Sequence, residues 1–376
     1  MKKPKVFLCW TLNSGTSFYR MMNPSVHMKD KYNFMFSKWS PDFQEVADWE
    51  YKINSKTDAQ VAKDLDFLTN ECDMVISQKF HSVGGLALMK FFREKFPKKP
   101  WFTDFDDNCF SLNPSSPAYE IYNPGSAGEM IIRDQIQMST GLIVSTENLR
   151  EVYERINPNI YVVPNGIDFS IWEKLKKPSK TKKIRIGWAG GGSHLDDLEF
   201  IEPAVTRISK KFSNVEFVFL GGVHPNYKDK SKIKAITKWY GIDKYPQALA
   251  DLNLDIALAP LRDNEFNRAK SNLRYLEYSA LGIPTIASNV TPFKMINSGK
   301  DGLLVTEVDE WENAMSELIT NQKMRKDMGK EAFLRVKKDY NIVKIADKYC
   351  DNLKDILAWK MNVSTKAMID AVTSLN

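Results

Sequence analysis

Short apolar runs of strand length alternate with segments of helical period along nearly the whole chain. In the first half the apolar runs cover 5–12, 32–39, 74–80, 100–107, 141–146 and 160–164, with helical segments such as 57–69, 85–95 and 129–138 between them. Several runs are apolar throughout rather than alternating, which is typical of strands covered on both faces. Alternation of strand and helix predicts parallel sheets with crossover helices, so we expect an α/β protein.

The same pattern starts again in the second half. Predicted strands cover 183–189, 215–221, 255–261, 284–288 and 302–305, and predicted helices cover 195–212, 271–281, 311–320 and 321–339. A Pro164-Asn165-Gly166 turn and a polar, basic stretch at 174–183 separate the halves. We therefore predict two Rossmann-like, doubly wound domains, 1–168 and 169–341, that face each other across a cleft. A helix at about 342–376 is expected to pack back on the first domain.

The composition limits the class of protein but does not choose a ligand. Of the 376 residues, 43% are hydrophobic and 27% are charged, which supports folded cores and excludes general disorder. No uncharged apolar run reaches the roughly 18 residues that a membrane-spanning helix needs. The four cysteines lie far apart, which disfavours a disulfide framework or a zinc site and favours reduced thiols in the cytoplasm. A net charge of +6 is compatible with nucleic acid, an acidic membrane or phosphorylated substrates.

Three consecutive glycines, Gly190, Gly191 and Gly192, follow a predicted strand and precede Ser193, His194 and the start of a helix. Glycines let backbone N–H groups approach an anion, and a helix N-terminus adds partial positive charge, so the pattern favours a phosphate or diphosphate. The pattern matches neither GxGxxG nor a Walker loop, which argues against a dehydrogenase. The alternative is a tight turn before a capped helix, with His194 as a surface or capping residue.

A second candidate stretch is NRAKSNLRYLEYSALG at 267–282, which also follows a predicted strand. Ser271 is a suitable N-cap, with Lys270 just before the helix and Arg274 in its first turn, so both cations suit a diphosphate. Glu277 falls in the apolar, inward-facing stripe and needs a partner there, either Arg274 or the hydroxyl pair of a ribose. A structural ion pair on an edge helix is the alternative.

Two further stretches lie where first-half strands end. TDFDDN at 103–108 carries Asp104, Asp106 and Asp107, which resemble a DxD metal motif and equally suit the hydroxyl groups of an acceptor. NSGTSFYR at 13–20 carries Gly15 and Thr16 at a strand-to-helix turn, a natural approach for a ligand. The alternatives are a solvated acidic loop and an ordinary turn.

Together these motifs resemble those of GT-B-fold glycosyltransferases of the family-4-like group, glycosyl transferases group 1. The resemblance rests on VVPNGID at 162–168, GWAGGGSHLDDL at 187–198, LAPLRDNEFNRAKSNLRYLEYSALGIPTIAS at 258–288 and SGKDGLLV at 298–305. TDFDDNCF at 103–110 is similar to an acidic strand-end motif in some bacterial and phage members. The resemblance implies transfer of a sugar from a nucleotide-sugar, with a UDP-sugar favoured, to an acceptor hydroxyl. It also implies retention of the anomeric configuration without a metal or other cofactor.

The resemblance also assigns roles to single residues. Glu277 matches the second glutamate of the family's E-x7-E motif, which binds ribose, whereas Ala269 stands where the first glutamate contacts the donor sugar. This departure leaves donor-sugar recognition open, with Glu265 and Asn267 as substitutes. We expect catalytic roles for Asp104, Asp106, His194 and Lys270, and no metal ligands. The expected donor-binding residues are Gly15, Thr16, Gly191, Gly192, Ser193, Ser271, Asn272, Arg274 and Glu277.

The acceptor is left open. A glycan, a lipid-linked sugar or a cell-surface polymer is preferred, and the basic amphipathic segment 86–101 is either a peripheral contact to the cytoplasmic membrane face or a crossover helix with a solvated basic side. Hydroxylated bases of DNA, as substrates of a phage-type enzyme, are an alternative because basic clusters lie at 174–183 and 228–234. A non-catalytic nucleotide-sugar-binding protein is a further alternative, given Ala269. The oligomeric state is not predicted.

Overall fold

The chain forms two compact units. A computed structural model describes residues 2–10, 14–38, 66–114, 116, 118–176, 178–179, 181–222, 227, 232–238 and 240–373. The first unit consists of Met1–Asp106, Pro124–Pro164 and Val343–Asn376, and the second of Asp107–Asn123 and Asn165–Ile342. The segment 107–123 therefore packs with the second unit, although it directly follows the acidic strand end of the first.

The first unit is built on a parallel sheet whose described strands have the order β2-β1-β3-β4-β5-β6. Val6 of the first strand pairs with Phe34 of the second on one side and with Met74 of the third on the other. The third, fourth and fifth strands are buried at every position, as expected when helices cover both faces. The strands are β1 (Lys5–Trp10), β2 (Asn33–Lys38), β3 (Met74–Gln78), β4 (Trp101–Phe105), β5 (Gly141–Val144) and β6 (Ile160–Val162).

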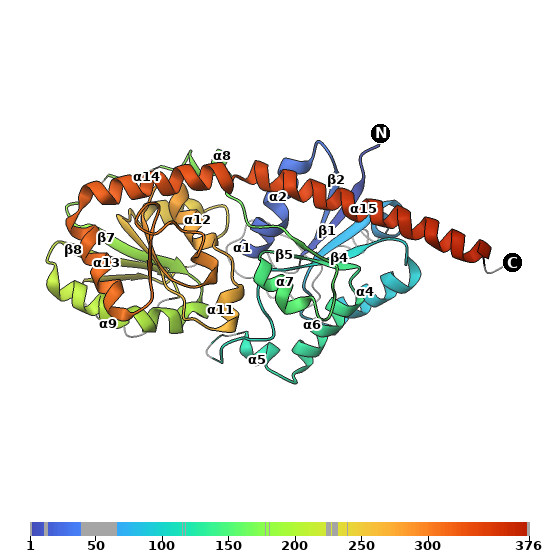
Figure 1. Cartoon of the computed structure of the whole chain (residues 1–376), viewed down its shortest axis with the longest axis horizontal. Helices are drawn as coiled ribbons and strands as arrows, with labels where there is room; N and C mark the ends of the chain where they lie inside the picture. The colour runs from blue at the N-terminus through green and yellow to red at the C-terminus, as the bar shows by residue number, and fades with distance from the viewer. Residues whose placement is uncertain are drawn as a thin grey trace. The chain divides into compact units, whose positions relative to one another are not determined.

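Helices connect these strands. From Gly15 the chain runs without a break through α1 (Gly15–Ser17), a π-helical segment η1 (Phe18–Met22) and α2 (Asn23–Met28). The long C-terminal helix passes α2 in Figure 1, and the Tyr32 hydroxyl donates to the carbonyl of Cys350 in that helix at 3.1 Å. The other helices of this unit are η2 (Phe67–Glu71), α4 (Val83–Lys95), α6 (Ala127–Met138), α7 (Glu147–Tyr153) and α15 (Ile342–Thr373).

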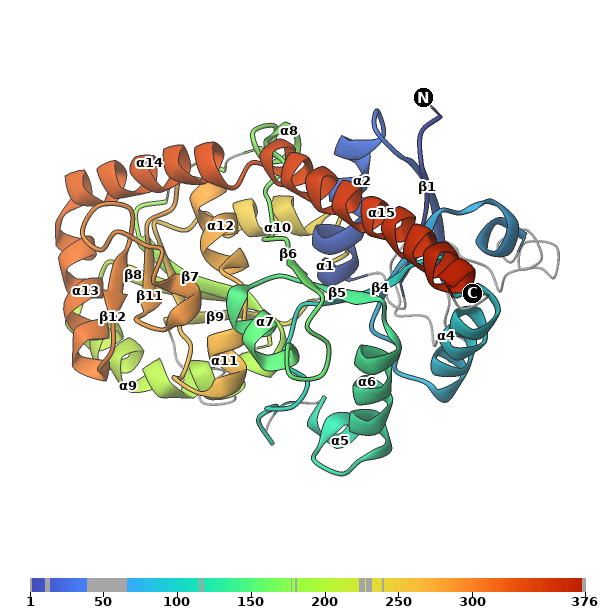
Figure 2. The same ribbon diagram turned by 45° about the vertical axis from the view of Figure 1, so that its right-hand side comes forward.

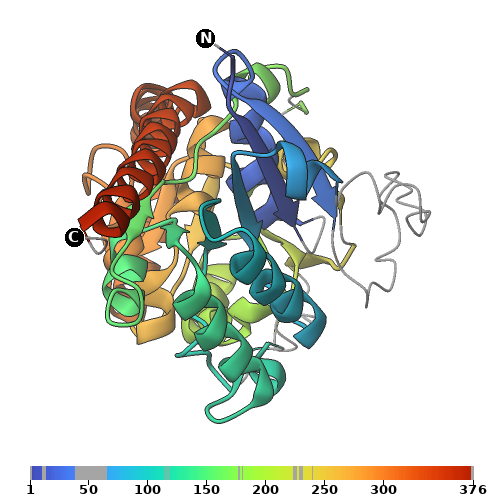
Figure 3. The same cartoon turned by 90° about the vertical axis from the view of Figure 1, so that its right-hand side faces the viewer.

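Helix α4 packs part of its apolar surface into the first unit. Met89 and Phe92 are buried in a core cluster with Val75 and Trp101. The helix lies beside α6, as Figure 3 shows. Part of the apolar side of the segment thus packs inside the unit, whereas Phe91 is 52% exposed. A peripheral membrane contact stays a prediction.

The second unit repeats this architecture, with the described strands in the order β12-β11-β10-β7-β8-β9. Its strands are β7 (Ile184–Gly190), β8 (Val215–Gly221), β9 (Ile233–Ile236), β10 (Ile256–Ala259), β11 (Thr285–Ser288) and β12 (Leu303–Val305). Its helices are α5 (Tyr119–Tyr122), α8 (Phe169–Trp172), η3 (Gly192–His194), α9 (Leu195–Lys211), α10 (Tyr245–Asp251), α11 (Glu265–Ala269), α12 (Leu273–Ala280), η5 (Thr291–Phe293), α13 (Val308–Thr320) and α14 (Gln322–Asp339). The two parallel sheets confirm the predicted α/β class.

The core of the second unit is dominated by aromatic side chains. Trp188, Phe217, Phe219 and Trp311 are fully buried in one cluster with residues of α9 and α13. These two helices lie side by side, at the lower left of Figures 1 and 2. Side chains of β7 and β8 pack in this core. Both strands end at the glycine turns described below.

One basic segment differs from its prediction, and one predicted helix is largely untested. Residues 228–234 were interpreted as a basic cluster, but Ile233–Ile236 forms the edge strand β9 beside β8. Lys232 and Lys234 alternate with apolar residues and hide the strand, because an edge strand exposes much of its surface. The predicted helix 57–69 lies outside the described residues except for 66–69, which enter η2.

Candidate active site

Two glycine turns meet at the carboxyl ends of β7 and β8. The Gly222 N–H donates to the carbonyl of Gly190 at 2.8 Å, and Gly221 has a φ of +96°, which favours glycine. A Cβ added at Gly222 would lie 2.7 Å from the nitrogen of Gly192. Because the backbone of one turn packs directly on the backbone of the other, Gly221 and Gly222 leave no room for a side chain. The predicted glycine loop is therefore a tightly packed turn.

The Arg274 guanidinium lies against this glycine loop. Arg274 comes from the first turn of α12 and stacks over the Trp188 ring, with its Cζ 4.9 Å from the ring centroid. A Cβ added at Gly190 would lie 2.6 Å from both terminal nitrogens of Arg274. The absence of a side chain at Gly190 thus makes room for the guanidinium, and Trp188 fixes its plane through a cation–π contact.

His194 closes the loop as a buried, neutral residue. Its Nδ1 lies 2.8 Å from Asp197 Oδ2, and Asp197 Oδ1 accepts from the N–H of Arg262 at 2.8 Å and from Asn267 Nδ2 at 2.9 Å. Burial, followed by the positive charges of Arg274 and Lys270, lowers the pKa of His194 to about 4. The side chain is therefore uncharged at neutral pH, and both cations act on it electrostatically.

Lys270 and Ser271 lie just before α12 and make contacts within the second unit. Lys270 Nζ lies 3.1 Å from Asp107 Oδ1 and 4.2 Å from the centroid of the Phe266 ring. Ser271 is not the N-cap that the sequence suggested, because α12 begins one residue later with Asn272 as its cap. The Ser271 hydroxyl instead accepts from Asn165 Nδ2 at 3.0 Å, which ties it to the VVPNGID motif.

Glu277 is buried, as its place in the apolar stripe predicted. It is only 5% exposed, and its Oε2 accepts from the Tyr245 hydroxyl at 3.1 Å. The neighbouring Tyr278 hydroxyl accepts from the N–H of Ala189 at 2.9 Å, so α12 is bonded directly to β7. The sequence reasoning missed Tyr245, because no spacing rule connects it with a helix about thirty residues further along.

The two substitutes considered for Ala269 already have partners. Ala269 itself is buried. Glu265 Oε2 accepts from the Ser111 hydroxyl at 2.8 Å, and Asn267 is buried on Asp197. Donor-sugar recognition through either residue stays a prediction.

A separate polar cluster lies in the first unit, where β3 and β4 end. Asp106 Oδ2 accepts from the Thr16 hydroxyl at 2.7 Å, and Asp106 Oδ1 lies 3.3 Å from Lys79 Nζ. Burial acts against ionisation of Asp106, but Lys79, the Thr16 hydrogen bond and Arg20 together hold its pKa below the ordinary value. Gly15 is exposed beside Thr16 at the first turn of α1. Lys79 was missed, since a single lysine after a strand carries no sequence signal.

Asp104, predicted as catalytic, lies in a buried ion pair. Both of its carboxylate oxygens accept from Arg20, whose Nε lies 3.0 Å from Oδ1 and whose Nη2 lies 2.9 Å from Oδ2. The Asp104 side chain is fully buried and that of Arg20 is 2% exposed. Burial raises the pKa of the Asp104 carboxyl, although Arg20 opposes the shift. The pair anchors the π-helical segment η1 to β4.

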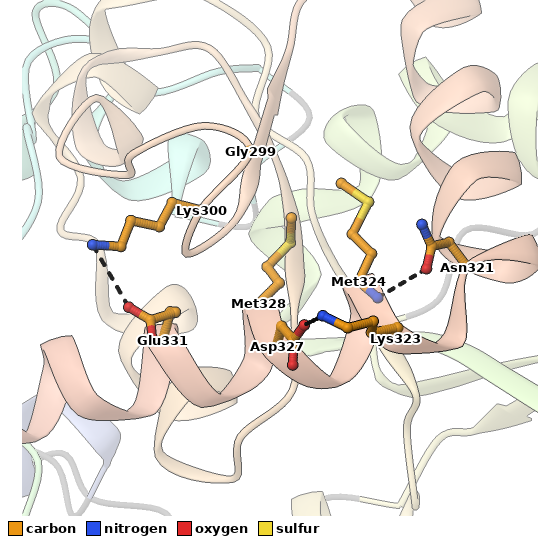
Figure 4. Close-up of a pocket in the computed structure, with 8 residues that line it drawn as sticks. All are labelled: Gly299, Lys300, Asn321, Lys323, Met324, Asp327, Met328 and Glu331. Carbon is orange, nitrogen blue, oxygen red and sulfur yellow. Dashed lines mark hydrogen bonds and ion pairs between the residues drawn. The ribbon is translucent and has the colours of Figure 1, made fainter.

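An open pocket in the second unit lies apart from these residues (Figure 4). Its volume is about 400 Å³, and its lining residues are Gly299, Lys300, Asn321, Lys323, Met324, Asp327, Met328 and Glu331. The charged side chains pair with one another, Lys300 with Glu331 at 3.6 Å and Lys323 with Asp327 at 2.6 Å. None of the predicted site residues lines it.

Metal binding and membrane crossing find no support in the described parts of the chain. Within those ranges, no three His, Cys, Asp or Glu side chains form a group that could hold a metal ion. Every helix in the part of the chain that the structure describes is too short or too polar to cross a bilayer.

The sequence of the second unit matches a known family. Residues 183–321 match the family model described as glycosyl transferases group 1. This range contains the glycine loop, Lys270, Arg274 and Glu277. Residues 183–321 therefore form a region of the glycosyl transferases group 1 type. Among curated proteins, no sequence matches it.

Solved structures resemble this chain along most of its length. HepE of Anabaena in complex with UDP has a TM-score of 0.61 at 12% identity, over 94% of this chain and 100% of that one. Sucrose-phosphate synthase of Thermosynechococcus elongatus has a TM-score of 0.61 at 13% identity, over 95% of this chain and 100% of that one. A mutant of S. aureus TarM in complex with fondaparinux, alpha-GlcNAc-glycerol and UDP has a TM-score of 0.52 at 14% identity, over 74% and 54%. At these identities the likeness establishes the fold, so the predicted GT-B architecture of two Rossmann-like units is confirmed.

Proposed function

We propose that this glycosyltransferase moves a sugar from a UDP-sugar to an acceptor hydroxyl. The observation that carries the proposal is the convergence of Arg274, Lys270 and the glycine loop around the neutral His194. Cations and glycine N–H groups at the carboxyl edge of a parallel sheet suit a diphosphate. Solved structures of the similar HepE hold UDP, UDP with glucose, and UDP-glucose, which supports a uridine nucleotide.

Each donor-binding residue contacts one part of the nucleotide-sugar. Gly191, Gly192 and Ser193 bind the diphosphate through the loop, and Lys270 and Arg274 neutralise its charge. Ser271 and Asn272 line the stretch between Lys270 and α12, and Glu277 accepts from the ribose hydroxyls, as the family resemblance implies. His194 stays neutral, so its ring offers hydrogen bonds without adding charge.

The chemical step needs stabilisation of the departing diphosphate. Breaking the bond between sugar and phosphate leaves negative charge on the nucleotide, and fixed positive groups stabilise that charge in the transition state. Arg274 is held in place before the donor arrives by its stack on Trp188. Losing one such preorganised group typically costs about 10²–10³ in turnover.

We assign the Asp106 cluster of the first unit to the acceptor. An ionised Asp106, held by Thr16 and Lys79, can accept a hydrogen bond from a sugar hydroxyl. Asp104 then acts by positioning, because its oxygens are already bonded to Arg20. A glycan, lipid-linked sugar or cell-surface polymer fits this hydroxyl chemistry, and retention follows from the family resemblance.

One of the lysines that motivated a DNA acceptor, Lys232, has a structural role. Lys232 Nζ donates to the carbonyl of Phe212 at 3.0 Å and also to that of Ser209, at the end of α9. This lysine satisfies helix carbonyls instead of standing ready for a phosphate. A glycan acceptor is therefore the proposal.

A transfer assay tests this function. The protein is incubated with a panel of UDP-sugars and sugar acceptors, with release of UDP and the product mass as readouts and NMR for the anomeric configuration. We expect turnover with at least one UDP-sugar, and a loss of about 10²–10³ in Arg274→Ala. Arg268→Ala is the control, since Arg268 pairs with Asp263 on the surface. Absence of UDP release from every donor would contradict the proposal.

A further inference from the structure

Glu277 depends on a partner from another helix. The carboxylate belongs to α12 and is 5% exposed, and the Tyr245 hydroxyl at the start of α10 donates to its Oε2 at 3.1 Å. A carboxylate in such surroundings costs free energy unless hydrogen bonds satisfy it. The tyrosine hydroxyl is therefore one of the groups that satisfy the buried Glu277 side chain.

The backbone holds both partners in place. The Tyr245 N–H donates to the carbonyl of Gly241 at 2.7 Å, and Pro246 occupies the first turn of α10. On the other side, the bond between Tyr278 and Ala189 ties α12 to β7. The backbone positions of Tyr245 and Glu277 are thus fixed by α10 and by the bond between α12 and β7.

The tyrosine keeps its proton throughout the physiological range. Burial and the negative charge of Glu277 raise the pKa of Tyr245 well above its ordinary value. The hydroxyl consequently remains a donor to Glu277 and does not compete with it as a base. A fixed donor on one oxygen restricts the rotation of the carboxylate, which favours recognition of two adjacent hydroxyls.

We propose that Tyr245 is a positioning residue for nucleoside recognition: it orients Glu277 so that the carboxylate accepts from the ribose hydroxyls of the donor. The proposal rests on the proposed function, which places the nucleotide at this site. Its consequence is specific. Tyr245 contributes to the discrimination between a ribonucleotide and a 2′-deoxyribonucleotide, although it does not itself touch the ligand.

The test compares UDP with 2′-deoxyuridine 5′-diphosphate by calorimetry. The wild type is expected to bind UDP about tenfold more tightly than the deoxy compound, because one hydrogen bond to a charged group is lost. In Tyr245→Phe we expect UDP to bind about five- to tenfold more weakly and the deoxy compound to change by less than about twofold. Once UDP-sugar turnover is measured, KM rises while kcat changes little.

Two further variants separate positioning from a structural role. Tyr275→Phe removes a buried hydroxyl of the same helix that donates to the carbonyl of Asp301 at 3.1 Å, and it should leave the UDP preference intact. In a Glu277→Gln background, Tyr245→Phe should not change the preference further. Equal weakening of both nucleotides by Tyr245→Phe, or an unchanged preference, overturns the proposal. A wild type that binds neither nucleotide contradicts the proposed function itself, which is a distinct outcome.

Discussion

Asp104 and Asp106 lie two positions apart yet have opposite environments. Asp104 is fully buried on Arg20, whereas Asp106 is 21% exposed beside Lys79 and Thr16. Asp104→Asn leaves the Arg20 charge buried without its partner, so we expect a loss of about 3–5 kcal/mol in the free energy of unfolding. Asp106→Asn should cost no more than about 1 kcal/mol.

For activity we expect the opposite order: Asp106→Asn should lose acceptor turnover directly, whereas Asp104→Asn should mainly lose stability. Asp106→Asn is expected to lower kcat/KM for the acceptor about tenfold or more. The reason is that the group at position 106, which accepts a hydrogen bond from the sugar hydroxyl, loses its negative charge. Urea unfolding and acceptor kinetics on both proteins check this. A stable, inactive Asp104→Asn would show instead that Asp104 takes part in the chemistry directly.

His194 makes the stability of the protein depend on pH in a defined window. Its pKa in the folded state is about 4, below the ordinary value of 6.5, so the unfolded chain takes up a proton that the folded chain refuses. The penalty is absent above pH 6.5 and grows as the pH falls towards 4. Between pH 7.5 and pH 5 it amounts to about 2 kcal/mol.

The variant His194→Gln should remove this part of the pH dependence. Urea unfolding at pH 7.5 and pH 5 is measured for both proteins, and the wild type is expected to lose more stability on acidification. Identical losses in the two proteins would mean that His194 is protonated in the folded state.

At the scale of elements, the glycine loop should tolerate substitution at one position and not at another. A Cβ at Gly192 meets open space, whereas one at Gly222 would lie 2.7 Å from the Gly192 nitrogen. We expect Gly192→Ala to keep the stability within about 0.5 kcal/mol. It should weaken UDP binding, since the methyl group would occupy the face that we propose for the diphosphate. Gly222→Ala should lose about 1–3 kcal/mol of stability.

Thermal unfolding and calorimetry on the two glycine variants check this expectation. The informative case is Gly192→Ala, which separates fold from binding. If it binds UDP as tightly as the wild type, the loop does not contact the nucleotide.

The elements that the sequence predicted are those with strong local patterns. The apolar strands β3, β4 and β5 are buried at every position, and their runs identified them. The edge strand β9 was missed because Lys232 and Lys234 suggested a solvated basic cluster. Glu277 was found from helical spacing alone, whereas Tyr245 and Lys79 became visible only through tertiary contacts.

At the scale of the whole molecule, the two units are built alike but carry different chemistry. The second unit holds the cations and glycines that suit a diphosphate, and the first holds an acidic cluster that suits hydroxyl groups. The segment 107–123 shows where sequence order misleads, since Asp106 belongs to the first unit and Asp107 to the second. Contacts between distant segments decide that assignment, and no local pattern reports them.

The central claim is that the second unit binds the diphosphate of a uridine nucleotide, and ligand-dependent thermal unfolding tests it most directly. UDP, GDP, ADP, dTDP and CMP are each added at the same excess to the wild type, Arg274→Ala and Arg268→Ala. A ligand at a hundred times its Kd stabilises the folded state by about 2.7 kcal/mol. We predict the largest rise in Tm with UDP, retained in Arg268→Ala and lost in Arg274→Ala. No rise with any diphosphate, or an equal rise in Arg274→Ala, would contradict the account.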